Sequence, residues 1–171
     1  MLRGILAVAA VCGAAVAPAN ADVTSKAPDG FIIQIRGEVA LDRDAAWARL
    51  TDVSSWWNSS HTYSGDSANL KLDAMAGGCW CELWSGGEVE HGRVVTVMPM
   101  SVIRIDGAFG PLQEMGVQGA MTFTLSDGAT GGTAITLDYK VNGSSLSKLD
   151  GLADVVNSVL AEQVAAFTTP G

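Results

Sequence analysis

The spacing of hydrophobic residues differs between two parts of the chain, residues 69–141 and residues 147–168. Residues 69–141 break into short runs of β-favouring residues separated by Gly and Pro, which is typical of antiparallel strands joined by turns. In the last run, Ile135, Leu137, Tyr139 and Val141 alternate with polar residues, and this predicts a strand with one buried face. Met121, Phe123 and Leu125 show the same alternation on the preceding run.

Residues 147–168 follow a helical period instead. Apolar residues recur there at steps of three and four, which predicts one long amphipathic helix. The polar face is assigned to Lys148, Asp154, Asn157, Glu162 and Gln163. We expect the apolar face to pack on the sheet.

The segment before the strand-rich region predicts a strand followed by two short helices. Residues 31–41 begin with a β-favouring run, and Asp42 is placed to cap a helix over residues 43–51. Residues 54–58, with Trp56 and Trp57 as core anchors, form a second short helix or turn, and a polar loop follows. The predicted fold class is α+β, with about six or seven antiparallel strands in the sheet.

The N-terminus reads as a cleavable export signal. Arg3 precedes an apolar run over residues 5–16, and Pro18 and the triplet Ala19-Asn20-Ala21 follow it. Signal peptidase would then cut before Asp22 and release the protein into the periplasm or the medium. An uncleaved anchor or buried helix is the alternative, although the run is too short to span a bilayer. We expect residues 22–30 to be a flexible lead-in and residues 31–169 to be one domain.

The length and charge of the chain argue against some classes of binding partner. Removing residues 1–21 from the 171-residue chain leaves 150, enough for one domain with its own core. The full chain has 10 Lys and Arg against 18 Asp and Glu, and losing Arg3 takes the net charge from −8 to −9. This balance argues against nucleic-acid binding. No second apolar run approaches the length of a membrane helix, so we expect a soluble mature protein of unknown oligomeric state.

A hairpin is predicted around Gly86-Gly87, where two glycines suit a tight turn. Counting outward pairs Glu82 with His91 and divides the two strands into faces. One face, interpreted as a cavity wall, holds Trp80, Glu82, Trp84, Val89, His91, Arg93 and Val95. The other face holds Cys79, Cys81, Leu83, Glu90, Gly92 and Val94.

Several of these residues could carry chemistry. Glu82 and His91 could transfer a proton, or they could form an ion pair or hydrogen bond that fixes strand register. Arg93 and Arg104 could bind a ligand carboxylate, or they could lie solvated on the sheet. His61 and Tyr63 belong to a polar loop that could line a cavity mouth, or they could only hydrogen-bond the fold.

The two cysteines of the mature chain are spaced two apart. Cys79 and Cys81 would point the same way from a strand, at a separation near the outer limit for a disulfide. They lack the further Cys or His ligands of a structural zinc site. Buried thiols are therefore the favoured interpretation, with no metal and no cofactor, and their redox state stays open.

Four segments resemble secreted bacterial proteins of the SRPBCC superfamily: 61–66 (HTYSGD), 77–82 (GGCWCE), 87–91 (GEVEH) and 107–113 (GAFGPLQ). The likeness covers residues 33–167 and is nearest to the branch of polyketide cyclases and activators of the heat-shock-protein ATPase. It implies a helix-grip fold, in which a curved sheet wraps the last helix and leaves a cavity. An ATPase-activating role conflicts with export, and no GxxxxGK[ST] phosphate loop is present.

The expected function is therefore binding of a hydrophobic or amphipathic small molecule between the sheet and the last helix. Expected ligand contacts are Trp80, Trp84, Glu82, His91, Arg93, Arg104, His61 and Tyr63. One alternative is a metal-free cyclase or hydratase-like enzyme that uses Glu82, His91 or His61 as acid and base. A protein-interaction module is the other alternative.

Overall fold

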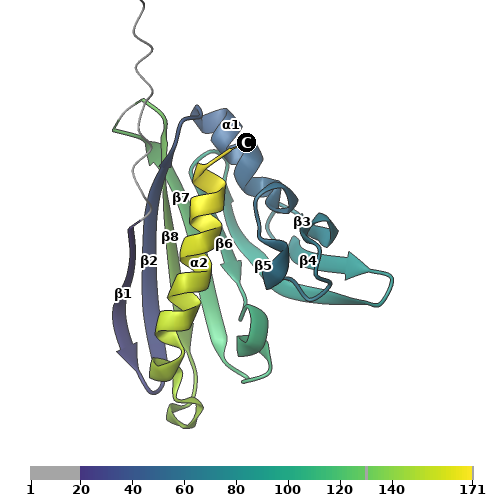
Figure 1. Cartoon of the computed structure of the whole chain (residues 1–171), viewed down its shortest axis with the longest axis vertical. Coiled ribbons are helices and arrows are strands. Elements are labelled where there is room, and N and C mark those ends of the chain that lie inside the picture. Colours follow the sequence, from purple (N-terminus) through teal and green to yellow (C-terminus); the bar gives the residue numbers. More distant parts are fainter. Residues whose placement is uncertain (1–19, 130, 171) are drawn as a thin grey trace, which may run out of the picture.

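The computed structural model describes residues 20–129 and 131–170. These residues form an α+β fold with one eight-stranded antiparallel sheet in the order β1-β2-β8-β7-β6-β5-β4-β3. Figure 1 shows α2 lying across the sheet and α1 at one end of it. The strands are β1 Asn20–Ala27, β2 Gly30–Val39, β3 Leu70–Leu72, β4 Cys79–Trp84, β5 Gly87–Met98, β6 Val102–Asp106, β7 Gln118–Asp127 and β8 Thr133–Asn142, and the helices are α1 Arg43–Thr51 and α2 Ala153–Thr168.

Short 3₁₀ turns join these elements. They are η1 Val53–Ser55, η2 Ser59–His61, η3 Ser67–Asn69, η4 Gly110–Gln113, η5 Ser145–Ser147 and η6 Leu149–Gly151. In the described part of the chain, no helix is long and apolar enough to cross a membrane. The predicted α+β class, antiparallel sheet and C-terminal helix are confirmed, whereas the count of six or seven strands is wrong.

The unexpected strand is β1, which occupies most of the segment expected to be a flexible lead-in. It pairs with β2 through partners such as Ala21 with Ile35 and Val23 with Ile33. As the edge strand it is largely exposed, so its sequence is polar and lacks the apolar alternation of an inner strand. Lys26 also forms an ion pair of 2.8 Å with Asp154 on α2. Residues 1–19 of the expected signal peptide lie outside the described residues.

The inner face of the sheet carries the core. Ile33, Ile35, Leu137, Tyr139 and Met121 are fully buried, which confirms the alternation predicted for the two runs that became β7 and β8. Strand β8 sits between β2 and β7, and this explains why its alternation is the clearest in the chain.

Helix α2 begins later than the predicted residue 147. Turns η5 and η6 precede it, and Lys148 between them adopts a left-handed conformation with φ 49°, which interrupts a continuous helix. On α2, Leu160, Val164 and Phe167 are buried as predicted. Gln163 is also fully buried, so its assignment to the polar face is wrong.

Helix α1 has the predicted bounds. The Asp42 side chain accepts a hydrogen bond of 2.8 Å from the amide of Ala45, as expected of an N-cap. Arg49 donates to the carbonyls of Ala166 and Phe167, at 3.0 Å each, and so places a positive charge at the C-terminal end of α2. Trp56 and Trp57 are buried and anchor the following segment, where the second short helix takes the form of 3₁₀ turns.

The β4–β5 hairpin differs from its predicted register. Trp84 pairs with Gly87, so Ser85 and Gly86 form the turn in place of Gly86-Gly87. A bulge then shifts the register, because Cys81 pairs with Glu90 but Trp80 pairs with Gly92, which leaves His91 as the extra residue on β5. Beyond the bulge the faces are exchanged, so Val94 is buried while Arg93 and Val95 face outward.

Candidate functional site

A cavity of about 620 Å³ opens between the sheet, α2 and the turns η2 and η4. Its wall from α2 consists of Val155, Val156, Val159 and Leu160, together with the N-cap residue Leu152, so several apolar helix positions face the cavity and are only partly buried. The remaining lining comes from Trp57, Ser60, His61, Thr62, Tyr63, Leu70, Trp80, His91, Phe109, Gly110, Pro111, Leu112, Glu114 and Tyr139. The lining is therefore mainly aromatic and aliphatic.

Aromatic rings form the floor of the cavity. Trp80 is 1% exposed, and its ring lies 5.1 Å from the rings of both Trp57 and Phe109 in edge-on contacts. The Phe109 ring also stacks at 6.1 Å on the imidazole of His91 and meets Tyr139 edge-on at 6.0 Å. Such contacts fix the ring orientations and give the cavity flat apolar surfaces.

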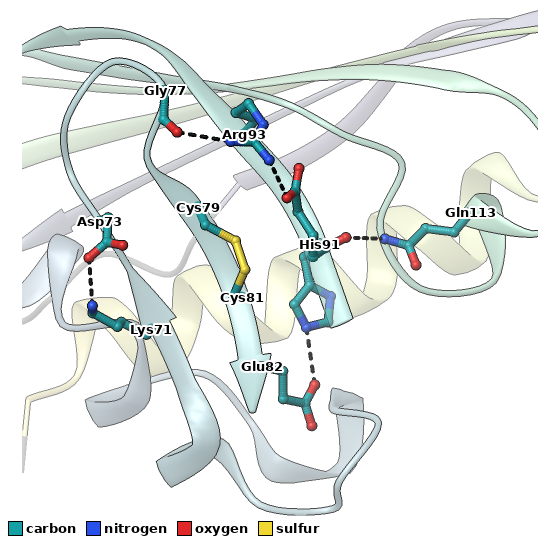
Figure 2. The surroundings of a disulfide bond; sticks show 10 residues. Lys71, Asp73, Gly77, Cys79, Cys81, Glu82, His91, Arg93 and Gln113 are labelled. Carbon is teal, nitrogen blue, oxygen red and sulfur yellow. Dashed lines mark hydrogen bonds and ion pairs between the residues drawn. A yellow bond between two sulfur atoms is a disulfide. The ribbon is translucent and has the colours of Figure 1, made fainter. Parts of the chain in front are cut away.

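The cavity has a polar end where His91 meets Glu82. Nε2 of His91 lies 3.0 Å from Oε2 of Glu82, whose side chain has no exposed surface (Figure 2). The backbone amide of Tyr63 donates to the same carboxylate at 3.0 Å, and the amide of Ser64 donates to its other oxygen. Glu82 and His91 are thus neighbours as predicted, although Glu82 pairs directly with Val89 and His91 is the extra residue of the bulge.

These hydrogen bonds set the charge of each partner. Burial alone would raise the pKa of Glu82, but hydrogen bonds from Ser64, the Tyr63 amide and His91 hold that pKa below its usual range. Burial lowers the pKa of His91, and the contact with Glu82 only partly offsets this. At neutral pH the carboxylate is therefore charged and the imidazole neutral.

This charge state decides which ring nitrogen of His91 can interact with a bound molecule. A carboxylate can only accept, so Nε2 of His91 carries the proton and donates a hydrogen bond to Glu82. Among the described residues no hydrogen bond engages Nδ1, and the ring lines the cavity. Nδ1 can therefore accept a hydrogen bond, or a proton, from a bound molecule.

The cavity mouth is formed by the polar loop that carries His61 and Tyr63. Nε2 of His61 lies 3.3 Å from a carboxylate oxygen of Glu162 on α2. The Tyr63 hydroxyl donates to the carbonyl of Gly110 at 3.1 Å and so connects the loop to η4. Both predicted residues line the cavity, and their hydrogen bonds also hold the fold together.

Two buried polar residues that support the cavity were missed from the sequence. Gln163 accepts a hydrogen bond of 2.7 Å from the amide of Asn58 and thereby ties the mouth loop to α2. Its helical spacing from Val156, Leu160 and Phe167 places it in the apolar stripe, and this signal could have revealed its burial.

Tyr139 is the second missed residue, because its alternation indicated only a core position. Its hydroxyl donates to the carbonyl of Gly107 at 3.2 Å and accepts from the amide of Phe109 at 3.1 Å. Burial raises the pKa of Tyr139 to about 12, so the hydroxyl stays protonated and continues to hold the segment that leads into η4.

Four predicted ligand contacts do not line the cavity. Glu82 has no exposed surface and contacts His91 in place of the cavity. Trp84 stands at the end of β4 and packs over the turn at Gly86. Arg93 projects from the outer face, where it pairs with Glu90 and donates to the carbonyl of Gly77 at 3.0 Å. Arg104 is exposed and donates to the Thr122 hydroxyl at 3.0 Å. The bulge in β5 accounts for Arg93, Trp84 lies at the turn end of β4, and Arg104 occupies an outward position of β6.

Cys79 and Cys81 are joined in a disulfide on the outer face of β4, in place of the expected buried thiols (Figure 2). Their Cα atoms are 5.4 Å apart, which is within the ordinary range for a disulfide and closer than a fully extended strand would place them. The two sulfurs and a Glu90 carboxylate oxygen lie within 4.8 Å of one another, a grouping that could hold a metal ion if the thiols were free. The disulfide bond occupies both sulfurs.

Comparison with known proteins supports the fold. No protein-family model matches the chain, and no curated protein matches it. Among solved structures, a protein from Rhodobacter sphaeroides matches with a TM-score of 0.58 and 15% identity, over 87% of this chain and 95% of its own. DynU16, a protein in the dynemicin biosynthetic locus, matches with a TM-score of 0.58 and 18% identity, over 80% of this chain and 45% of its own.

The di-domain ARO/CYC protein StfQ, from the steffimycin biosynthetic pathway, matches with a TM-score of 0.54 and 10% identity. That match covers 82% of this chain and 50% of StfQ. At these identities the likeness shows the fold alone, and that fold is consistent with the expected SRPBCC-type architecture. The chain is thus an α+β protein in which an antiparallel sheet and a C-terminal helix enclose a cavity.

The lowered pKa values predict that acid destabilises the protein. Below its ordinary pKa of 6.5, His91 takes up a proton in the unfolded chain before it does so in the fold. Glu82 adds to the loss below its ordinary pKa of 4.5, for the same reason. The free energy of unfolding, measured by urea denaturation, should fall between about pH 7.5 and about pH 5.5.

In the variant His91→Gln, the free energy of unfolding should decrease much less over this pH range. His61→Gln, which changes the only other histidine, should show the wild-type decrease. A wild-type unfolding free energy that does not change over this pH range would contradict the assignment of a neutral, buried His91.

Proposed function

We propose that this protein binds a hydrophobic or amphipathic small molecule in the cavity between the sheet and α2. The observation that carries the proposal is the cavity itself, about 620 Å³ in volume and lined chiefly by apolar side chains. Small-molecule sites fall in this size range and combine apolar walls with a few polar groups. Shape and apolar contact then supply most of the affinity.

The arrangement of the lining favours a ligand with a flat apolar body and one polar end. The edges and faces of Trp57, Trp80 and Phe109 offer flat contact surfaces, while Nδ1 of His91 offers a single acceptor. A ligand hydroxyl or N–H group that donates to Nδ1 satisfies this acceptor. StfQ, a di-domain ARO/CYC protein from a biosynthetic pathway, shares the fold, and this agrees with a small-molecule ligand.

A second candidate function is acid-base catalysis of a cyclisation or dehydration, and the Glu82–His91 contact favours it. Glu82 fixes the tautomer of His91 and leaves Nδ1 unprotonated on a ring that lines the cavity, so the neutral imidazole could remove a proton from a bound substrate. The imidazolium formed would be stabilised by the adjacent carboxylate. We rank binding first because the same carboxylate also anchors the amides of Tyr63 and Ser64, so the contact has a structural role in any case.

We further propose that the protein acts after export. The proposal rests on the sequence of residues 1–21 and on the expected cleavage before Asp22. Cleavage there would remove Asn20 and Ala21, the first two residues of β1, and would leave the remaining β1–β2 partners in place.

The binding proposal predicts that filling the cavity abolishes uptake of an apolar probe. Nile red, a neutral dye whose fluorescence rises in apolar surroundings, should bind the wild-type protein. Val159→Trp places an indole in the cavity from α2 and should weaken binding by at least about tenfold. Val95→Trp on the exposed outer face of β5 is the matched control and should bind like the wild type.

If both variants lost binding equally, or if neither lost it, the cavity could not be the binding site.

His91→Gln separates the two candidate functions. In a carrier, the molecule extracted from this variant has the same mass and chromatographic retention as that extracted from the wild type. In an enzyme, the variant holds unreacted substrate, which differs from the wild-type molecule by one water after a dehydration and in retention alone after a cyclisation.

The export proposal predicts a mature N-terminus at Asp22. Expression of the full chain in a Gram-negative host, followed by N-terminal sequencing of the periplasmic fraction, should read DVTSK. Ala19→Arg disrupts the small residue of the cleavage triplet and should leave the precursor uncut in the cells. Wild-type protein that stays in the cytosol with residues 1–21 attached would refute export.

A further inference from the structure

The disulfide on β4 has two charged neighbours. The side chains of Cys79 and Cys81 are both half-buried on the outer face of the sheet. Their cross-strand partners on β5 are Arg93 and Glu90, respectively, and Figure 2 shows these strands side by side. A carboxylate oxygen of Glu90 lies within 4.8 Å of both sulfurs. The bond therefore lies partly exposed on the outer face, next to the ion pair of Glu90 and Arg93.

Stability of the fold does not explain this disulfide. A disulfide stabilises a protein mainly by restricting the unfolded chain, and that effect grows with the length of chain enclosed. Here the bond encloses Trp80 alone. Trp80 is already held by its pairing with Gly92 and by ring contacts with Trp57 and Phe109. Opening the disulfide should therefore leave the sheet intact.

Arg93 gives the sulfurs a chemical environment suited to exchange. Its guanidinium is held in place by the Gly77 carbonyl at 3.0 Å and by the Glu90 carboxylate. The Glu90 carboxylate, within 4.8 Å of both sulfurs, would by itself disfavour a thiolate, and its ion pair with Arg93 offsets this negative charge. Because Arg93 is the strand partner of Cys79, we assign the leaving thiolate to Cys79, where this offset favours its release in disulfide exchange.

We propose that Cys79 and Cys81 form a thiol–disulfide exchange site for low-molecular-weight thiols and disulfides. The thiolate of a small thiol attacks Sγ of Cys81, a new S–S bond forms, and the Cys79–Cys81 bond breaks with Cys79 leaving as a thiolate beside Arg93. A second small thiolate then attacks the mixed disulfide and releases a small disulfide and the Cys81 thiolate. Two electrons pass from the two small thiols to the protein, and their two protons end on the cysteines. The reverse sequence oxidises the pair.

This activity is separate from the proposed ligand binding. Trp80, between the two cysteines, points into the cavity, while the cysteines lie on the opposite face of β4. Loss of Nile red binding in a cavity variant therefore says nothing about exchange, and the two proposals can fail independently.

The test follows the redox state of the full chain in glutathione buffers. Samples are equilibrated at several ratios of reduced to oxidised glutathione and quenched with iodoacetamide. Tryptic peptide 72–93, which contains both cysteines and excludes Cys12, is then weighed by mass spectrometry. The oxidised fraction should follow the ratio reversibly, with an unchanged near-UV circular dichroism spectrum. Arg93→Gln, whose tryptic peptide spans residues 72–104, should slow reduction by about three- to tenfold, because Glu90 is then left uncompensated beside the leaving thiolate.

Arg104→Gln, at the other outer-face arginine named above, is the matched control and should reduce at the wild-type rate. The double variant Cys79→Ser with Cys81→Ser should fold and bind Nile red as the wild type does. The proposal is overturned if the disulfide opens only when the protein unfolds, if the double variant does not fold, or if Arg93→Gln is reduced at the wild-type rate.

Discussion

Glu82 is a buried carboxylate, and a charge of this kind has to find its hydrogen bonds inside the protein. The amides of Tyr63 and Ser64 and the imidazole of His91 provide them. These donors belong to the mouth loop and to β5, whereas Glu82 belongs to β4. One charged group therefore joins the loop to the sheet, and the polar end of the cavity is built where they meet.

The rest of the cavity is kept open by polar contacts at its rim. Gln163 holds the mouth loop against α2 through the amide of Asn58, and Tyr139 holds the segment that leads into η4. The Tyr63 hydroxyl connects these two loops through Gly110. Apolar walls on their own would tend to collapse together, so fixed polar contacts around the rim preorganise the cavity for a ligand.

Helices and strands could be predicted from the sequence where a single strong local pattern indicated them. The alternation in β8 and the Asp42 cap of α1 were read correctly, because each reflects a local rule. Strand β1 was missed because an exposed edge strand needs no apolar alternation. The start of α2 was misplaced because the left-handed Lys148 breaks a pattern that is otherwise continuous.

The site was harder to predict because it depends on register. Turns at Ser85-Gly86 and at Gly86-Gly87 are both compatible with the glycines, and both place Glu82 and His91 on the same face of the hairpin. The direct partner of Glu82 is Val89, however, and the bulge at His91 exchanges the faces of β5 beyond it. Arg93 lies beyond the bulge and faces outward, where it neighbours the disulfide instead of the cavity.

The central claim is that the cavity between the sheet and α2 holds a small molecule. Native mass spectrometry of the protein, gently purified from the cells that produce it, tests this claim most directly. Our account predicts a second species heavier than the protein by one small organic molecule, which Val159→Trp should remove and Val95→Trp should retain. A spectrum that contains only the unliganded chain, for wild type and both variants alike, would contradict it.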